Sequence, residues 1–301
     1  MGDRLASVGR SLGGTVLTRS DLARHTGRVK RGVRRVLPLT FGWEHLPRRT
    51  SMPLVPEAEG RVFLREPVPG LLLETEDGYV LLDTGFNGAL VRDRAFYHRF
   101  WGRRTTKLEL SGPGDPLEDA FAHVGVDPRD VVAVAVSHLH NDHVGGLRHF
   151  AGRAPVHLQR KELEAAVADP LASERNAMFR IDFDDPRIEW RLADGDVEIA
   201  PGVTALLTAG HTPGHQSFLV ELDRSAGGGG YVFAFDAADL QENLDRDEPV
   251  SAAFGGDPRS TLPAIRRLKA IAAERGFPLI PGHDPDVWPR FTRELGVAAR
   301  T

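Results

Sequence analysis

Four residues that can bind metal ions lie close together: His138, His140, Asp142 and His143 directly follow the apolar run 131–136. Side chains of an extended segment alternate between two faces, so His138 and His140 point the same way and can bind one ion. The chain must then turn, which allows Asp142 and His143 to reach a second ion. Three imidazoles and a carboxylate beside an apolar strand would be costly to desolvate without a cation. This segment therefore predicts a metal site.

Further ligands must come from later in the chain, because a divalent ion needs four or more. Three later segments, each directly after a predicted strand, carry histidine or aspartate. They supply His211 with His215, Asp236 with Asp239, and His283. An aspartate can bridge two ions because each of its oxygens can bind a different one.

The composition limits the kinds of metal site and partner. The chain has 301 residues, a net charge of −4 and no cysteine. Without thiols there is no disulfide framework, zinc finger or iron–sulfur cluster, so nitrogen and oxygen atoms must bind the metal. The net charge argues against a general affinity for nucleic acid. No apolar run is long enough to span a bilayer or to form a signal peptide, which predicts a cytoplasmic protein without a membrane partner.

The chain divides into two parts by its patterning. Residues 1–35 are rich in Arg, Gly and Ser with weak periodicity, and are predicted to be a partly disordered N-terminal extension. Their basic cluster, 28–35, is a solvated arm or frayed helix in one interpretation and a contact for a partner or anionic surface in the other. No linker interrupts residues 36–301, which predicts one domain.

The elements that must position these side chains are short strands interleaved with helices. Asp115 followed by Pro116 is a helix start with a proline in the first turn, and Asp257 before Pro258 is another. The segment 76–78 is typical of a hairpin turn. Two sets of strands, each followed by helices, predict an α/β fold with an αββα layered sandwich. The predicted strands are 37–43, 61–67, 71–75, 79–83, 131–136, 155–159, 203–208, 216–222, 231–236 and 277–280, and the helices 116–123, 161–168 and one beginning at 258.

The order of these motifs resembles the metallo-β-lactamase superfamily. His-x-His-x-Asp-His is followed by a Gly-His, an aspartate after a strand and a histidine after a strand, from about Phe41 to His283. The resemblance implies the four-layer αββα sandwich of that superfamily and a two-metal site. It also implies that Asp83, in an early Asp-x-Gly turn, orients a ligand, and that His211 is not a ligand. The implied ligands are His138, His140 and His215 for one ion, Asp142, His143 and His283 for the other, and Asp236 as the bridge.

Within the superfamily, the segments 72–78, 158–166 and 211–217 are similar to the N-acyl homoserine lactonases, a quorum-quenching branch. One residue departs from that branch: Asp239 stands where those lactonases place a tyrosine that contacts the substrate carbonyl. Asp239 could donate a proton to the leaving oxygen, reshape the pocket for a different ester, or point to solvent.

The resemblance implies metal-dependent hydrolysis of a lactone ring, of N-acyl homoserine lactone or a related small molecule. A hydroxide that bridges two divalent ions would attack the carbonyl, and Asp142 or Asp239 would pass the proton. Zinc is the default metal, and iron, cobalt or manganese also suit these ligands. Three alternatives are an aryl-ester or phosphotriester hydrolase that resembles methyl parathion hydrolase, a nuclease, and a non-catalytic scaffold. A homodimer is compatible with the sequence.

Two aromatic pairs lie at helical spacing before the metal motif. Tyr97 with Trp101, or Phe96 with Phe100, would share one face of a helix. Such a pair either contributes to the substrate pocket or packs in the core.

Overall fold

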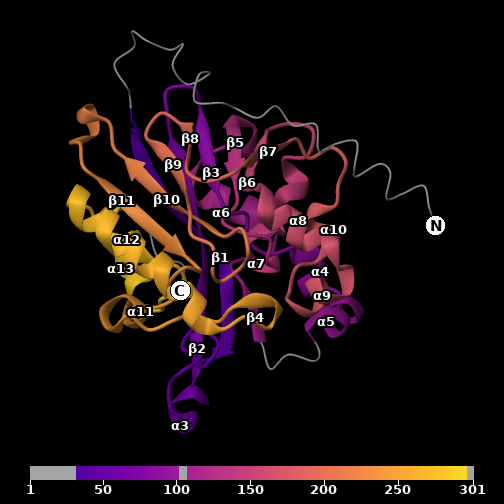
Figure 1. Ribbon diagram of the computed structural model, residues 1–301. Coiled ribbons are helices and arrows are strands. Elements are labelled where there is room, and N and C mark those ends of the chain that lie inside the picture. The colour runs from indigo at the N-terminus through magenta and orange to yellow at the C-terminus, as the bar shows by residue number, and fades with distance from the viewer. Residues whose placement is uncertain (1–31, 102–106, 297–301) are drawn as a thin grey trace.

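Two sheets form the middle of the molecule in the computed structural model, which describes residues 32–101 and 107–296 (Figure 1). The N-terminal extension and its basic cluster therefore lie mostly outside the described residues. Val33 is buried and pairs with Leu222, so the fold already includes the residues just before the first strand.

The larger sheet has seven strands in the order β4-β1-β2-β3-β5-β6-β7. Its strands β1 to β3 pair in antiparallel fashion, whereas β3, β5, β6 and β7 are parallel. The strands are β1 Arg35–Pro47, β2 Phe63–Glu74, β3 Tyr79–Leu82, β4 Lys107–Leu110, β5 Val131–Ala135, β6 Val156–Gln159 and β7 Trp190–Ala193.

The smaller sheet has five strands in the order β12-β11-β10-β9-β8. Strands β8 to β11 are antiparallel, and β12 joins β11 in parallel. The strands are β8 Val197–Ala200, β9 Val203–Leu207, β10 Gln216–Glu221, β11 Gly230–Phe235 and β12 Leu279–Pro281.

Helices cover the outer faces of both sheets, as Figure 1 shows for α8 and α10 on one side and α12 on the other. None of the helices in the described part of the chain is long and apolar enough to cross a membrane. The helices are α3 Glu57–Gly60, α4 Gly88–Arg92, α5 Arg94–Trp101, α6 Pro116–Val124, α7 Asn141–Val144, α8 Arg160–Ala168, α9 Pro170–Arg175, α10 Arg180–Phe183, α11 Gln241–Arg246, α12 Leu262–Arg275 and α13 Val287–Glu294.

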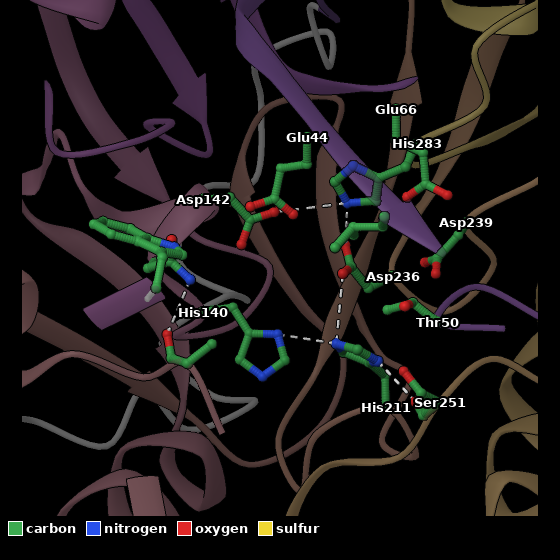
Figure 2. A pocket seen from close by; sticks show the side chains of 14 residues that line it. Glu44, Thr50, Glu66, His140, Asp142, His211, Asp236, Asp239, Ser251 and His283 are labelled. Carbon is green, nitrogen blue, oxygen red and sulfur yellow. Dashed lines mark hydrogen bonds and ion pairs between the residues drawn. The ribbon is translucent and has the colours of Figure 1, made fainter. Parts of the chain in front are cut away.

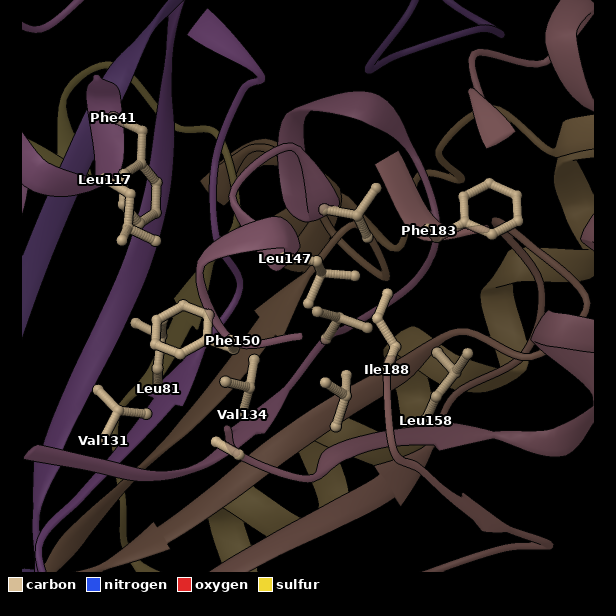
Figure 3. Packing of buried hydrophobic residues seen from close by; sticks show 14 of the residues in the cluster. Phe41, Leu81, Leu117, Val131, Val134, Leu147, Phe150, Leu158, Phe183 and Ile188 are labelled. Carbon is tan, nitrogen blue, oxygen red and sulfur yellow. The ribbon is translucent and has the colours of Figure 1, made fainter. Parts of the chain in front are cut away.

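Three apolar layers hold the sandwich together. Leu72 on β2 packs with Phe121 of α6 on the outer face of the larger sheet, part of the cluster in Figure 3. Its neighbour Leu71 faces the opposite way, into the layer between the two sheets, as strand alternation requires. A third layer joins the outer face of the smaller sheet to Ile265 and Leu268 of α12. The predicted α/β fold with four αββα layers is confirmed.

Most predicted elements appear close to their predicted positions, with two differences. The predicted strands 61–67 and 71–75 form one continuous strand, β2. Its Pro69 lies opposite Thr40, where the register of β1 shifts, and proline is tolerated at such a bulge. The helix predicted from Pro258 begins as a 3-10 turn capped by Asp257, and the α-helix starts at Leu262.

The strand order brings four strand ends to one edge of the sandwich. β3 and β5 are parallel neighbours, and so are β11 and β12. The carboxyl ends of parallel strands lie at the same edge of a sheet. The residues after these four ends are Asp83, the motif from Ser137 to His143, Asp236 and His283.

Candidate metal centre

Two groups of buried donors meet at this edge. In the first group the ligand atoms of His138, His140, His211 and Asp236 lie within 4.8 Å of one another. Nδ1 of His140 and Nε2 of His211 form a hydrogen bond of 3.1 Å. This bond leaves Nε2 of His140, which is buried and has no hydrogen-bond partner, as the atom that can bind an ion.

The second group consists of Asp142, His143 and His283, again within 4.8 Å of one another. His143 Nε2 is 3.0 Å from Asp142 Oδ2. His283 comes from the end of β12, and its Nδ1 donates to the carbonyl oxygen of Pro67 at 2.8 Å. That hydrogen bond leaves Nε2 free to face the centre.

Asp236 connects the two groups. Its Oδ1 lies 3.1 Å from His283 Nε2 and 3.3 Å from His143 Nε2. Its Oδ2 lies 3.4 Å from His211 Nε2 and 3.7 Å from His138 Nε2. Figure 2 shows Asp236 between His211 and His283. Each oxygen thus faces a different group, which is the arrangement expected of a bridging carboxylate.

Several donor atoms of the site are left without a hydrogen-bond partner that a metal ion would replace. The Nε2 atoms of four histidines are buried and make no hydrogen bond: His138, His140, His143 and His215. Buried polar atoms are seldom left without a partner, and a cation would satisfy these nitrogens. Burial also lowers the pKa of His140 to about 3, so its ring is neutral, the form that binds metals. The nitrogen and oxygen donors match the absence of cysteine.

His211 and His215 both lie in the turn after β9 and approach the first donor group in different ways. His211 belongs to that group and lines the cavity. Its Nδ1 donates to the carbonyl oxygen of Ser251 at 2.9 Å, and its Nε2 lies 3.1 Å from Nδ1 of His140, so both of its nitrogens have hydrogen-bond partners. Nδ1 of His215 lies 2.9 Å from the hydroxyl of Thr208, while its Nε2 is buried and has no hydrogen-bond partner. The implied role of His215 as a ligand stays a prediction, and its unpartnered Nε2 is the atom that would bind the ion.

Asp83 orients the His143 ring of the second group by hydrogen bonding, which is the role implied for it. Its Oδ2 accepts a hydrogen bond from Nδ1 of His143 at 2.6 Å. Its Oδ1 accepts from the backbone N–H of Ser137 at 2.6 Å. The His143 ring is thereby fixed with Nε2 directed at the centre, as is common for histidine ligands.

Glu162, at the start of α8, joins two segments of the site and was not identified from the sequence. Its carboxylate accepts from the backbone N–H of Leu139 at 3.0 Å and of Gly214 at 2.8 Å. Gly214 allows this approach, because a Cβ atom there would lie 2.2 Å from the Glu162 nitrogen. A buried glutamate in the first turn of a predicted helix gives no sequence signal that distinguishes it from a solvated one.

A cavity of about 180 Å³ opens over the donors (Figure 2). Asp239 is 5% exposed and lines this cavity, so it faces the site rather than bulk solvent. Glu44 and Glu66 line it too, although neither was identified from the sequence. Burial, and then the charge of Asp236, raise the pKa of Asp239 well above its usual range. Burial raises the pKa of Glu66 to about 7.

The aromatic pair at helical spacing belongs to both the core and the cavity. Tyr97 and Trp101 lie on α5 with ring centroids 5.7 Å apart. Trp101 is buried, packs edge-on against Phe179, and lines the cavity. In the other pair Phe96 is 41% exposed, and the side chain of Phe100 is outside the described part.

Comparison with known families agrees with this geometry. The sequence profile of the metallo-β-lactamase superfamily matches residues 63–283. The chain belongs to the metallo-β-lactamase superfamily, as its motifs indicated, and is a metal-dependent hydrolase of that superfamily.

Among its relatives are N-acyl homoserine lactonases. It is 32% identical over 223 residues to one from Bacillus thuringiensis, covering 73% of this chain and 82% of the relative. It is 34% identical over 239 residues to the lactonase AttM of Azorhizobium caulinodans, covering 76% and 86%. A solved N-acyl homoserine lactone hydrolase, with its product N-hexanoyl-L-homoserine bound at the catalytic metal centre, superposes with a TM-score of 0.72 at 29% identity, covering 85% of this chain and 95% of that one.

Proposed function

We propose that this protein opens the ring of a lactone, N-acyl homoserine lactone or a related one, with two divalent metal ions bound. The observation that carries the proposal is Asp236, whose two oxygens face two donor groups at the floor of a cavity. The similarity to lactonases supports the choice of a lactone as substrate. Zinc is the proposed metal, and the imidazole and carboxylate donors would also bind iron, cobalt or manganese.

We assign the ligands by group. His138, His140 and His215, whose Nε2 atoms are buried without a hydrogen-bond partner, would bind one ion. Asp142, His143 and His283 would bind the other, and Asp236 both. Bound there, the ions supply a water molecule activated for attack on the carbonyl and stabilise the negative charge that develops on its oxygen.

The remaining chemistry is proton transfer, which we assign to Asp142 and Asp239. Both line the cavity, and ring opening breaks the bond between the carbonyl carbon and the ring oxygen. The departing oxygen needs a proton, and the attacking water loses one. Burial, and then the charge of Asp236, raise the pKa of Asp239, which favours the protonated form that can donate a proton to this oxygen. The product is a hydroxy acid.

Hydrolysis of a substrate panel tests the proposal. The panel contains N-acyl homoserine lactones of several chain lengths, simple γ-lactones, an aryl ester and a nitrophenyl phosphotriester. We expect proton release from lactones at rates well above those for the phosphotriester. A protein with two bound ions that hydrolyses the phosphotriester or aryl ester but no lactone would assign the site to the other branch.

A further inference from the structure

Ser137, the residue before the first histidine of the metal motif, contacts one histidine from each donor group. Its side chain is fully buried. Its hydroxyl oxygen Oγ lies 3.0 Å from Nδ1 of His138 and 3.3 Å from Nδ1 of His143. The same oxygen lies 2.7 Å from Oδ2 of Asp83. One hydroxyl group is thus in contact with a proposed ligand of the first ion, a proposed ligand of the second ion, and the carboxyl group that orients the latter.

The direction of these hydrogen bonds follows from the chemistry of a histidine ligand. A neutral histidine that binds a metal ion through Nε2 carries its proton on Nδ1. Nε2 of His138 is buried without a hydrogen-bond partner, so Nδ1 carries the proton and donates it to Ser137 Oγ. The Ser137 hydroxyl has one proton of its own, and it donates this proton to Oδ2 of Asp83. These two hydrogen bonds form a relay from His138 through Ser137 to Asp83.

Asp83 contacts the two histidines in different ways. Nδ1 of His143 donates directly to Asp83 Oδ2 at 2.6 Å. His138 is connected to Asp83 only through the Ser137 hydroxyl, which is the one hydrogen-bond partner of His138 Nδ1 among the described residues. The backbone N–H of Ser137 also donates to Asp83 Oδ1 at 2.6 Å, which holds the carboxyl group beside the hydroxyl. The hydroxyl is therefore the single link between Asp83 and the first donor group through His138.

We infer that Ser137 is a positioning residue that connects the two metal sites, because its hydroxyl lets Asp83 orient a ligand of the first ion as well as one of the second. The inference rests on the ligands proposed above and adds a role for a residue that binds neither ion. A hydrogen bond to the outer nitrogen of a histidine ligand fixes the ring, and its loss weakens metal binding about 10- to 100-fold. Affinity for the first ion should therefore depend on Ser137 and, through Ser137, on Asp83.

The variant S137A tests the inference when each ion is measured alone. H283A removes a proposed ligand of the second ion and leaves the first site, whereas H215A removes a proposed ligand of the first ion and leaves the second. In the H283A background, Zn²⁺ titration should show that S137A lowers the affinity for the first ion about tenfold or more. In the H215A background S137A should have little effect, because His143 keeps its hydrogen bond to Asp83.

Ser173 provides a matched control. It is as fully buried as Ser137, and its hydroxyl makes hydrogen bonds to the carbonyl oxygens of Ala166 at 2.7 Å and Asp169 at 3.0 Å. S173A should therefore lower stability toward urea as S137A does, but keep the affinity for both ions. A loss of metal affinity in S173A equal to that in S137A would be a general effect of destabilisation and would overturn the inference.

A double-mutant cycle tests the connection to Asp83. With Ser137 present, D83N should weaken binding of the first ion as well as the second, because a neutral amide is a weaker acceptor. In S137A, D83N should no longer affect the first ion but should still weaken binding of the second. An unchanged first-ion affinity in S137A, or an equal effect of D83N on that ion with and without Ser137, would overturn the inference. These titrations use no substrate, so the expected affinities in a protein that hydrolyses no lactone would support the relay and contradict only the proposed function.

Discussion

Nδ1 of His140 and Nε2 of His211 face each other at 3.1 Å across 71 residues of sequence. The proton of His211 lies on Nδ1, because that atom donates to the Ser251 carbonyl oxygen. Nε2 of His211 therefore accepts the hydrogen bond from Nδ1 of His140. This contact fixes the His140 ring with its buried, unpartnered Nε2 available to a metal ion.

Substitution of the two histidines separates their roles. H215A should lose one of two metal ions, with affinity for that ion lowered more than about 100-fold, because the buried Nε2 that would bind it is removed. H211A removes only the hydrogen-bond acceptor of His140, so affinity should fall about 10- to 100-fold. Metal analysis and Zn²⁺ titration of the purified variants measure this directly. Two ions kept in H215A with one lost in H211A would contradict the assignment.

Asp83 is expected to control metal affinity without touching the metal. In D83N the amide keeps the size of the carboxylate, and asparagine tolerates the positive φ of 58° at this position. The charged acceptor for His143 is lost, so affinity for the second ion should fall about 10- to 100-fold. Titration of the metal-free protein with Zn²⁺ checks this. An unchanged affinity would show that Asp83 has only a structural role.

Glu162 should stabilise the folded protein through its two hydrogen bonds to the backbone. E162Q keeps one acceptor oxygen, so one of the N–H groups of Leu139 and Gly214 loses its partner in a buried place. We expect a loss of about 1–3 kcal/mol in the free energy of unfolding. Urea unfolding measures it, with the exposed neighbour Glu164 as the control position for E164Q. Equal stability of E162Q and E164Q would contradict this account.

Asp182 predicts a pH dependence of stability that is independent of the metal centre. Burial raises its pKa to about 7, although hydrogen bonding to Asn87 and the charge of Arg148 lower it. A raised carboxyl pKa means that the folded state binds the proton more tightly than the unfolded state. The stabilising contribution is complete below about pH 4 and is lost as pH rises to about 7, a change of about 4 kcal/mol.

The variant D182N cannot titrate, and it keeps an acceptor for the Asn87 amide. The Tm of D182N minus that of the unmodified protein should therefore increase between pH 4 and pH 8. Asp194, which is exposed, gives the control D194N. A difference in Tm that is constant with pH would show that Asp182 is ionised in the folded protein throughout.

The sequence was most informative where residue type and strand alternation act together. The segment from His138 to His143 predicted two donor groups because its spacing follows directly from an extended strand and a turn. Spacing alone does not distinguish His211 from His215, because both lie in one tight turn. Their roles depend on distant partners: the Ser251 carbonyl and His140 for His211, and the Thr208 hydroxyl for His215.

Other features depend on contacts that no local pattern encodes. Strands β7 and β8 are four residues each and only partly buried, so they lack a clear apolar alternation. Glu44 and Glu66 lie on the long strands β1 and β2, where an acidic residue usually faces solvent. Only the pairing of these strands over the metal centre turns both side chains into the cavity.

Proton release from a γ-lactone, measured before and after removal of the metal ions, tests the central claim most directly. We predict one proton per ring opened, loss of this activity when a chelator removes the ions, and its return with two equivalents of Zn²⁺. A protein that holds two ions at Asp236 and its neighbours yet releases no proton from any lactone would contradict the account.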